Sequence, residues 1–373
     1  MAMVLADDGF GHPANSGALT VSPAGAEVPT KPLWEHVVPA ATCCKLLPGS
    51  ALTGLPVSLC VGTSSGRLQI WGEDDAQHIA QHSMNDSISC ISVLTARQEL
   101  PVIAAGDNSG NVGMFRLQAL GDDADVGDMD EDSDEGADRS GASQPLVNLG
   151  RLDLYDSCTT TVAMNPFRSG VAASGSEDGR MNMLYLGETL QTDGIRSEDS
   201  ACVNDIVFWT PDAIVVAGSN PGGLLRTWDA RAPDSMQVLP GAVGANARMT
   251  SLAVHPSVPY QLACGDDAGG ISLWDLRTGR CAGRHVTHQE TVTSLVYHPD
   301  RPQVLLSASD DGMVRALNTH FPRESMQAPL YSFNGLACTG IDVCGDELSG
   351  PLLMAAGENE TVTLTPLYQI LRM

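Results

Sequence analysis

A glycine followed five residues later by a bulky side chain recurs along this chain at a nearly constant interval. Six such pairs and a degenerate seventh are present: Gly66 and Trp71, Gly110 and Phe115, Gly179 and Leu184, Gly223 and Trp228, Gly269 and Trp274, Gly312 and Leu317, and Glu360 and Thr365. The residue numbers of successive first members differ by 44, 69, 44, 46, 43 and 48, so five of the six intervals are close to one repeat length. A second spacing agrees with the first, because Pro166, Pro256 and Pro299 each stand the same distance in the chain before their own glycine.

The stretch from Met249 to Gly279 shows what one copy encodes. Apolar residues alternate with other residues in three short segments, and this period of two is typical of half-buried β-strands. His255-Pro256 ends the first strand, because proline has no N–H group for a sheet ladder. The turn from Asp267 to Gly270 contains glycines, which accept a positive φ without steric cost. Three short strands cannot bury their own faces, so one copy is not stable alone.

Repeats of about 40–45 residues that contain several short strands are typical of β-propeller blades. The pattern resembles WD40 repeats over roughly residues 33–366 and yields seven units. We therefore predict an all-β fold, a seven-bladed WD40 β-propeller that occupies residues 31–373. The composition agrees with many strands joined by tight turns, since the chain has 38 Gly and 22 Pro.

The two ends of the chain predict how the ring closes. Residues 1–30 are rich in Gly, Ala, Pro and Ser and have no period, so we predict a disordered N-terminal segment. The seventh unit reaches only Pro366 and lacks an outer strand. WD40 propellers commonly place an N-terminal strand there, and the resemblance assigns Leu33–Val38 to this role. Such a closure would remove the open sheet edge of the last blade.

The one long interval coincides with an acidic insert in blade two, residues 121–144. Residues 122–138 contain ten Asp or Glu and no basic residue. A block of like charges with few apolar residues repels itself, so we predict a disordered, solvated loop. A contact for a basic partner is the alternative. An EF-hand site is disfavoured, because Ser133 and Arg139 stand where that motif needs Gly and Glu.

The overall charge excludes some classes of function. The net charge is −25 and only 20 Lys and Arg are present, whereas a nucleic-acid surface needs a concentrated basic footprint. We therefore predict no direct contact with nucleic acid. Apolar runs long enough to cross a bilayer, about 18 residues or more, do not occur in the sequence, so we predict no membrane insertion.

WD40 blades often contain a buried network of a loop histidine, a turn aspartate, a Ser or Thr and the closing tryptophan. The resemblance places the turn aspartate at Asp178 and Asp311, and His288 is placed to pair with Asp311. We assign these residues and the bulky closing positions a structural role in the blades; the closing positions are Trp71, Phe115, Trp228 and Trp274.

Catalytic motifs are missing from the sequence. It contains no HExxH, no Walker A motif, no GxSxG and no GxGxxG that opens a strand-to-helix unit. Of the histidines, we place His285 and His288 in a loop between blades, and His298 stands just before a strand-ending proline. We therefore predict no catalytic residue, no cofactor, no metal site and no enzyme activity.

The run from blade four to blade six narrows the resemblance. It reads VVAGSNPGGLLRTWDAR, then SLAVHPSVPYQLACGDDAGGISLWDLRTG, then HQETVTSLVYHPDRPQVLLSASDDGMVRAL. These segments and the atypical last blade resemble the WD-repeat nucleoporins of the outer-ring Y complex. The resemblance implies a scaffold at the nuclear pore, in the nuclear envelope, that docks on α-solenoid nucleoporins and supports protein and mRNA transport.

A rival family is indicated by two WDxR motifs, which end at Arg231 and Arg277. Substrate receptors of cullin-four ubiquitin ligases often carry such a motif, with the arginine meeting the adaptor of the ligase. Arg231 and Arg277 are therefore candidate partner contacts in this alternative. The motif also follows simply from a WD dipeptide before a turn, in which case the arginine makes a local ion pair. A third possibility is another WD40 scaffold.

Overall fold

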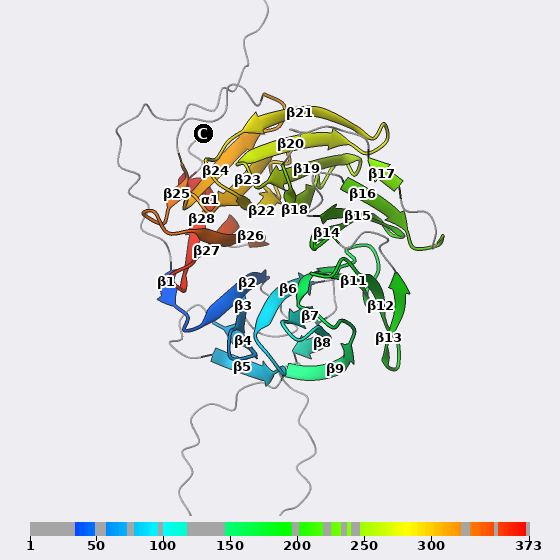
Figure 1. The fold of residues 1–373 in the computed structure, drawn as a ribbon. Coiled ribbons are helices and arrows are strands. Elements are labelled where there is room, and N and C mark those ends of the chain that lie inside the picture. Colours follow the sequence, from blue (N-terminus) through cyan, green and yellow to red (C-terminus); the bar gives the residue numbers. More distant parts are fainter. Residues whose placement is uncertain are drawn as a thin grey trace, which may run out of the picture.

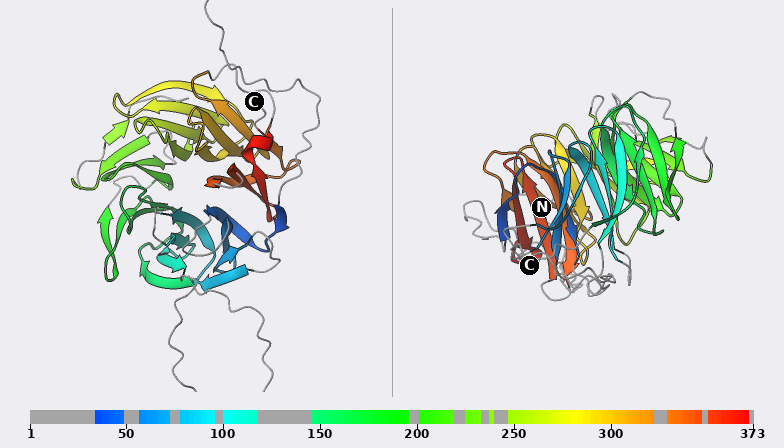
Figure 2. Two further views of the ribbon diagram at one scale, coloured as in Figure 1. Left: turned by 180° about the vertical axis from the view of Figure 1, so that it is seen from behind. Right: turned by 90° about the horizontal axis from the view of Figure 1, so that it is seen from below.

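The computed structural model describes residues 34–48, 57–72, 78–95, 100–117, 146–195, 201–218, 225–232, 237–239, 247–321, 329–346 and 350–370. These residues form seven four-stranded sheets that stand as blades in a ring (Figure 1). Two further views show the same ring from behind and from below (Figure 2). The predicted all-β, seven-bladed WD40 propeller is thus confirmed. The predicted disordered segment 1–30 and acidic insert 121–144 lie outside the described residues.

Each blade has an inner, a second, a third and an outer strand. The inner strands are β2 (Ala41–Leu47), β6 (Ile88–Leu94), β10 (Thr159–Met164), β14 (Val203–Thr210), β18 (Met249–Val254), β22 (Val292–Tyr297) and β26 (Cys338–Asp346). The second strands are β3 (Ser58–Thr63), β7 (Val102–Asp107), β11 (Val171–Ser176), β15 (Ala213–Gly218), β19 (Gln261–Asp266), β23 (Val304–Ser309) and β27 (Gly350–Gly357). The third strands are β4 (Arg67–Trp71), β8 (Asn111–Leu117), β12 (Met181–Leu186), β16 (Leu225–Asp229), β20 (Gly270–Asp275), β24 (Met313–Asn318) and β28 (Thr361–Pro366). The outer strands are β5 (His78–Ser83), β9 (Leu146–Asp153), β13 (Leu190–Ile195), β17 (Gln237–Leu239), β21 (Arg280–Val286), β25 (Tyr331–Ser332) and, in blade seven, β1 (Trp34–Val37).

Strand β1 closes the ring, as the sequence predicted. It pairs antiparallel with β28, with Trp34 opposite Leu364 and Val37 opposite Thr361. The backbone N–H of Val38 also donates to the carbonyl of Glu360 at 2.9 Å. The first and last strands of the chain therefore share one sheet, which covers the outer edge of β28. A four-residue helix, α1 (Leu367–Ile370), follows β28.

The connections between strands fall on two faces of the ring, because neighbouring strands in a blade are antiparallel. We call the upper face the one that carries the turns between second and third strands and the segments that lead into the next blade. The lower face carries the connections from inner to second strands and from third to outer strands.

The predicted turn glycines explain the repeat spacing. On the upper face, all those that the structure describes have a positive φ: Gly66 (76°), Gly110 (85°), Gly179 (86°), Gly269 (75°) and Gly312 (76°). The degenerate seventh anchor, Glu360, adopts the same conformation with a φ of 62°. At Gly269 a Cβ atom would also lie 2.2 Å from the carbonyl oxygen of His288, so this turn needs glycine for space as well.

The hydrophobic core lies between neighbouring blades. Val38, Leu46 and Trp71 of the first part of the chain pack with Met354 and Leu364 of blade seven in one buried cluster. The blades therefore bury against each other the faces that one blade alone would expose.

Candidate functional site

The inner strands carry a ring of polar side chains that the sequence analysis missed. Each inner strand has a β-bulge against its second strand. The residue at the bulge is a Thr, Ser or Asn in every blade: Thr42, Ser89, Thr160, Asn204, Thr250, Thr293 and Thr339. A bulge bends the strand and re-aims a side chain. All seven of these residues line the central cavity, which has a volume of about 530 Å³.

These bulge residues tie neighbouring blades together. In six blades the side chain donates a hydrogen bond to the carbonyl of the first inner-strand residue in the next blade. The donors and acceptors are Thr42 and Ile88, Ser89 and Thr159, Thr160 and Val203 (2.5 Å), Asn204 and Met249 (2.6 Å), Thr250 and Val292 (2.6 Å), and Thr293 and Cys338 (2.6 Å). Thr339 of blade seven instead donates within its own blade, to the carbonyl of Ala356 at 3.2 Å.

Charge is sparse in the central cavity. Among its described lining residues only Lys45 and Asp205 are charged. Asp205 accepts hydrogen bonds from the backbone N–H groups of Ile206 (2.8 Å) and Leu252 (2.7 Å), so its carboxylate links blades four and five. Burial raises the pKa of Asp205 to about 6, although these N–H donors favour the charged form.

His288 and Asp311 are paired in blade six. The Nδ1 atom of His288 lies 3.0 Å from Oδ2 of Asp311, and Nε2 lies 2.8 Å from Oγ of Ser307. The histidine is 3% exposed, and burial lowers its pKa. Leu317 fills the closing position of this blade and is fully buried. The network therefore joins the upper-face turn to the second strand of the blade.

Tyr155 holds the matching position in blade three. It stands as far before Gly179 in the chain as His288 stands before Gly312. Its hydroxyl lies 2.6 Å from Oγ of Ser174, and Ser174 and Ser307 likewise stand at matching positions before these two turn glycines. The sequence analysis missed Tyr155 because it considered only histidine at this position, although the spacing between Tyr155 and its turn glycine is visible in the sequence.

Blade five is built differently. Asp266 is fully buried and accepts two hydrogen bonds from Arg284 on the outer strand, at 2.6 and 2.9 Å. Trp274 is 1% exposed, and its indole Nε1 is buried without a hydrogen-bond partner in the described structure. Cys264 stands where blade six has Ser307, at the matching position before the turn glycine.

The other predicted closing positions are also buried. Trp71 is 8% exposed, Phe115 is fully buried and Trp228 is 4% exposed. The indole Nε1 of Trp71 donates to Oε1 of Gln69 at 3.3 Å. Asp178, the predicted turn aspartate of blade three, lies in the upper-face turn and accepts from the backbone N–H of Arg180 at 3.0 Å.

One placement from the sequence needs correction. His285 lies on outer strand β21, opposite Ile271 of β20, and not in a loop between blades. Strand β21 runs on to Val286 because it pairs with the whole third strand of blade five.

Within the described ranges, no three His, Cys, Asp or Glu side chains gather closely enough to hold a metal ion. The same ranges contain no helix that is long and apolar enough to cross a membrane.

Three lower-face turns share one kind of cap. His298 accepts hydrogen bonds at Nδ1 from the backbone N–H groups of Asp300 (3.1 Å) and Arg301 (3.2 Å). In blade five, His255 accepts at Nδ1 from the backbone N–H groups of Ser257 and Val258. In blade three the acceptor is Oδ1 of Asn165, which precedes Pro166 as the histidines precede their prolines. The regular spacing of these prolines in the sequence therefore marks a capped turn.

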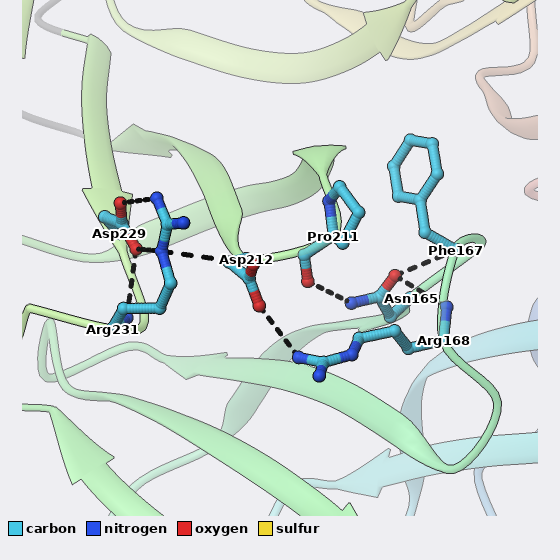
Figure 3. A network of polar contacts seen from close by, with 7 residues as sticks. All are labelled: Asn165, Phe167, Arg168, Pro211, Asp212, Asp229 and Arg231. Carbon is cyan, nitrogen blue, oxygen red and sulfur yellow. Dashed lines mark hydrogen bonds and ion pairs between the residues drawn. The ribbon is translucent and has the colours of Figure 1, made fainter.

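Arg231 and Arg277, the two WDxR arginines, lie on the lower face of adjacent blades. Arg231 makes two hydrogen bonds to Asp229, at 2.9 and 2.6 Å, and lies 3.9 Å from Asp212 (Figure 3). Arg277 binds Asp275 in the same way, at 3.2 and 2.8 Å. Its guanidinium carbon also lies 3.5 Å from the ring centroid of Tyr260. Both arginines thus make the local ion pair of the simpler interpretation.

Comparison with known proteins agrees with this architecture. The model of the family described as "WD domain, G-beta repeat" matches residues 279–316. The proteins called Nucleoporin Nup43 in mouse and human are 28% identical over 159 residues, which is 42% of this chain and 40% of theirs. Nuclear pore complex protein nup43 of Dictyostelium discoideum is 28% identical over 137 residues, 37% of this chain and 32% of the relative. WD repeat-containing protein GTS1 of Arabidopsis thaliana is 31% identical over 187 residues, 48% of this chain and 47% of the relative.

Each of these matches covers less than half of the relative's length. The seven four-stranded blades extend the repeat well beyond the segment matched by the family model. The chain is a seven-bladed WD40-repeat protein that resembles the Nup43 nucleoporins.

Proposed function

We propose that this protein is a non-enzymatic scaffold nucleoporin, a structural component of the outer-ring Y complex of the nuclear pore. The observation that carries the proposal is the similarity to Nup43 proteins of three organisms. The architecture supports it, because a closed ring with rigid inter-blade contacts presents loops for docking on other proteins. The partners would be α-solenoid nucleoporins, and the site of action would be the nuclear envelope.

The chemistry of the described site also favours a scaffold. The titratable groups with the clearest geometry, His288 with Asp311 and Asp266 with Arg284, are saturated by partners inside single blades. A general base or nucleophile must reach a substrate, whereas these groups hold turns and strands together. Their geometry therefore supports a role in the stability of the ring rather than in catalysis.

A tagged copy of the full chain tests the proposal. We expect a punctate signal at the nuclear rim, and purification at mild salt should recover outer-ring nucleoporins with α-solenoid folds. Diffuse staining together with purification free of nucleoporins would contradict the proposal.

A substrate receptor of a cullin-four ligase is the second candidate. It is favoured by the exposure of Arg231 (71%) and Arg277 (59%) on adjacent blades of one face. The double substitution Arg231→Ala and Arg277→Ala separates the two functions. A ligase receptor should lose its adaptor and cullin, since an interfacial arginine is a common hot spot worth about 2 kcal/mol or more. Our proposal assigns no such role to these arginines in anchoring at the pore, so the rim signal should remain.

A further inference from the structure

The negative charge of blades five to seven is concentrated on their upper face. Five described segments there contain six Asp or Glu and no Lys or Arg: residues 267–269, 287–291, 310–312, 333–337 and 358–360. The described lower-face segments of blades five and six contain one Asp and two Arg: residues 255–260, 276–279, 298–303 and 319–321. The net charge of −25 is therefore not spread evenly over the two faces of the ring.

The five upper-face segments form one continuous band, which we call the acidic band. Each turn between a second and a third strand is joined by backbone hydrogen bonds to the segment that leads into the next blade. The donors and acceptors are His288 and Gly269 (3.0 Å), Asp310 and Thr291 (3.0 Å), Phe333 and Gly312 (2.9 Å), and Glu358 and Ala337 (2.9 Å). The band therefore runs without a break from blade five to blade seven.

Most carboxylates of the acidic band are not neutralised within the protein. Asp311 is paired with the buried His288. The other five have no Lys, Arg or His within ion-pair distance in the described structure: Asp267, Glu290, Asp310, Glu358 and Glu360. Arg248 lies nearby, yet its bond to Asp267 comes from its backbone N–H, at 2.9 Å. The band thus keeps its charge, whereas each lower-face arginine of a WDxR motif is bound to its own carboxylate.

The acidic band borders the upper mouth of the central cavity. The bulge residues come near the start of each inner strand, and the inner strands start at the upper face. A second cavity, of about 350 Å³, connects the two features. It is lined by Asp267 and Arg248 of the upper face and by the bulge residues Thr160, Asn204 and Thr250.

The hydroxyl groups around this mouth are acceptors toward a ligand. Six of the seven bulge residues are Thr or Ser, and each hydroxyl already donates its single proton to a backbone carbonyl. Of the two charged lining residues, Lys45 lies deeper along its strand and is paired with Asp342 at 3.9 Å, whereas Asp205 directly follows a bulge residue. The ring of bulge residues therefore suits a group that only donates, such as an ammonium or a guanidinium.

We propose that a basic segment of a partner protein docks on the acidic band and places a Lys or Arg side chain in the mouth of the central cavity. Two separate observations select this chemistry. Carboxylates without a counter-charge attract a positive partner and repel a negative one. Hydroxyls whose protons are already donated accept from a side chain that has donors alone. The inference rests on the proposed scaffold function and names the face and the partner chemistry that this function would use.

A photo-crosslinking amino acid tests the location. The full chain is expressed in cells with p-benzoylphenylalanine in place of Leu336, which lies in the acidic band and is 42% exposed. A second copy carries it in place of Phe321, which follows β24 on the lower face of blade six and is 61% exposed. We expect position 336 to capture one peptide of a partner protein in which Lys and Arg outnumber Asp and Glu. Position 321 should not reach that peptide.

The captured peptide, made synthetically, then serves as the probe in a direct binding measurement. Glu290→Gln with Asp310→Asn and Glu358→Gln should raise its Kd at least tenfold and remove most of the increase in Kd between low and high salt, because salt screens exposed charges. Asp300→Asn is the matched control, since Asp300 is exposed on the lower face. This variant should bind like the unchanged protein.

Thr339 separates the effect of charge from that of size at the cavity mouth. Its hydroxyl donates within its own blade, so replacing it breaks no side-chain bond between blades. Thr339→Lys should raise Kd at least tenfold, because its ammonium occupies the place of the partner's cation. Thr339→Glu should lower Kd, although it is as bulky as many blocking residues. Thermal unfolding of each variant shows that the fold is retained, and an equal rise of Kd in both would contradict the inference.

Three further results would overturn the inference: no crosslink from position 336, a captured peptide without an excess of Lys and Arg, or loss of binding when a Gly-Ser linker replaces residues 122–138. The last would mean that the acidic insert, and not the acidic band, binds the peptide. Failure of the inference remains distinct from failure of the proposed function. A chain that reaches the nuclear envelope and recovers nucleoporins, but gives no crosslink from position 336, would refute the docking site alone.

Discussion

Asp342 of blade seven accepts a hydrogen bond from the backbone N–H of Leu46 in blade one, at 2.9 Å from Oδ2. This is the junction at which the chain closes on itself, and here the bulge residue Thr339 bonds within its own blade. Lys45 of blade one adds an ion pair to Asp342 at 3.9 Å. The carboxylate therefore joins blades seven and one, the pair for which the described residues show no bulge side chain bonded to a carbonyl of the next blade.

Removing that carboxylate should weaken the closure of the ring. We expect Asp342→Ala to lower the free energy of unfolding by about 1–3 kcal/mol, because the Leu46 N–H loses its acceptor in a partly buried site. Denaturant unfolding measures the change. Glu358→Ala is the control, since Glu358 is exposed in the upper-face turn of the same blade. Equal stability of the two variants would show that Asp342 does not hold the junction.

The N-terminal strand should be required for a soluble ring, whereas the residues before it should not. Deleting residues 1–30 should leave the melting temperature unchanged. Deleting residues 1–40 removes β1 and exposes the edge of β28, so this truncation should aggregate. Val38→Ala probes the same junction without truncation. Val38 is fully buried between blades seven and one, so the loss of two methyl groups should cost about 2 kcal/mol. Two truncations of equal stability would refute the closure by β1.

Local signals in the sequence were enough to predict the number of blades. The turn at Gly269 needs a positive φ and free space, so its position is fixed by the backbone of one hairpin. The same constraint acts in each hairpin, which makes the spacing regular. Glu360 was also predicted correctly as a turn residue. It adopts the same positive φ as the glycines, and Thr365 follows it by five residues in a strand that pairs in regular register with β27.

The contacts between blades were not predicted, since they join residues that are far apart in the chain. Thr160 bonds to Val203 and Thr250 to Val292, and neither partner is special as a residue type because its backbone carbonyl is the acceptor. A weak signal exists, as both threonines stand at the same distance in the chain before their turn glycines.

Two ion pairs of similar geometry should differ widely in their effect on stability. Arg284 forms a bidentate contact with Asp266, which is fully buried, whereas Arg231 forms one with the partly exposed Asp229. We expect Arg284→Ala to lower the free energy of unfolding by about 3–5 kcal/mol, because a buried carboxylate loses its counter-charge. Arg231→Ala should change the free energy of unfolding far less, because water screens an exposed ion pair. Equal values from chemical denaturation of the two variants would contradict the role of burial.

The histidine caps should make the stability of the ring depend on pH. Nδ1 of His255 and Nδ1 of His298 each accept two backbone N–H groups, so a proton on that atom would face two donors. Burial lowers the pKa of both histidines. Their pKa in the unfolded chain is about 6.5, so the unfolded state takes up the proton first as the pH falls. The stabilisation from the caps is therefore complete above about pH 6.5 and is lost as the pH falls below that value.

Blade three supplies the variant that isolates this effect. Asn165 caps its turn through Oδ1, which does not titrate, so His255→Asn with His298→Asn should keep the turns and remove the sensitivity. We expect the free energy of unfolding of the unchanged protein to fall between about pH 7.5 and about pH 5.5, and that of the double variant to fall less. Asp205 acts in the opposite direction, because its raised pKa of about 6 favours the folded state as the pH falls. This contribution is common to both proteins, so the difference between the two pH profiles reports on the two caps. Parallel profiles would refute the assignment.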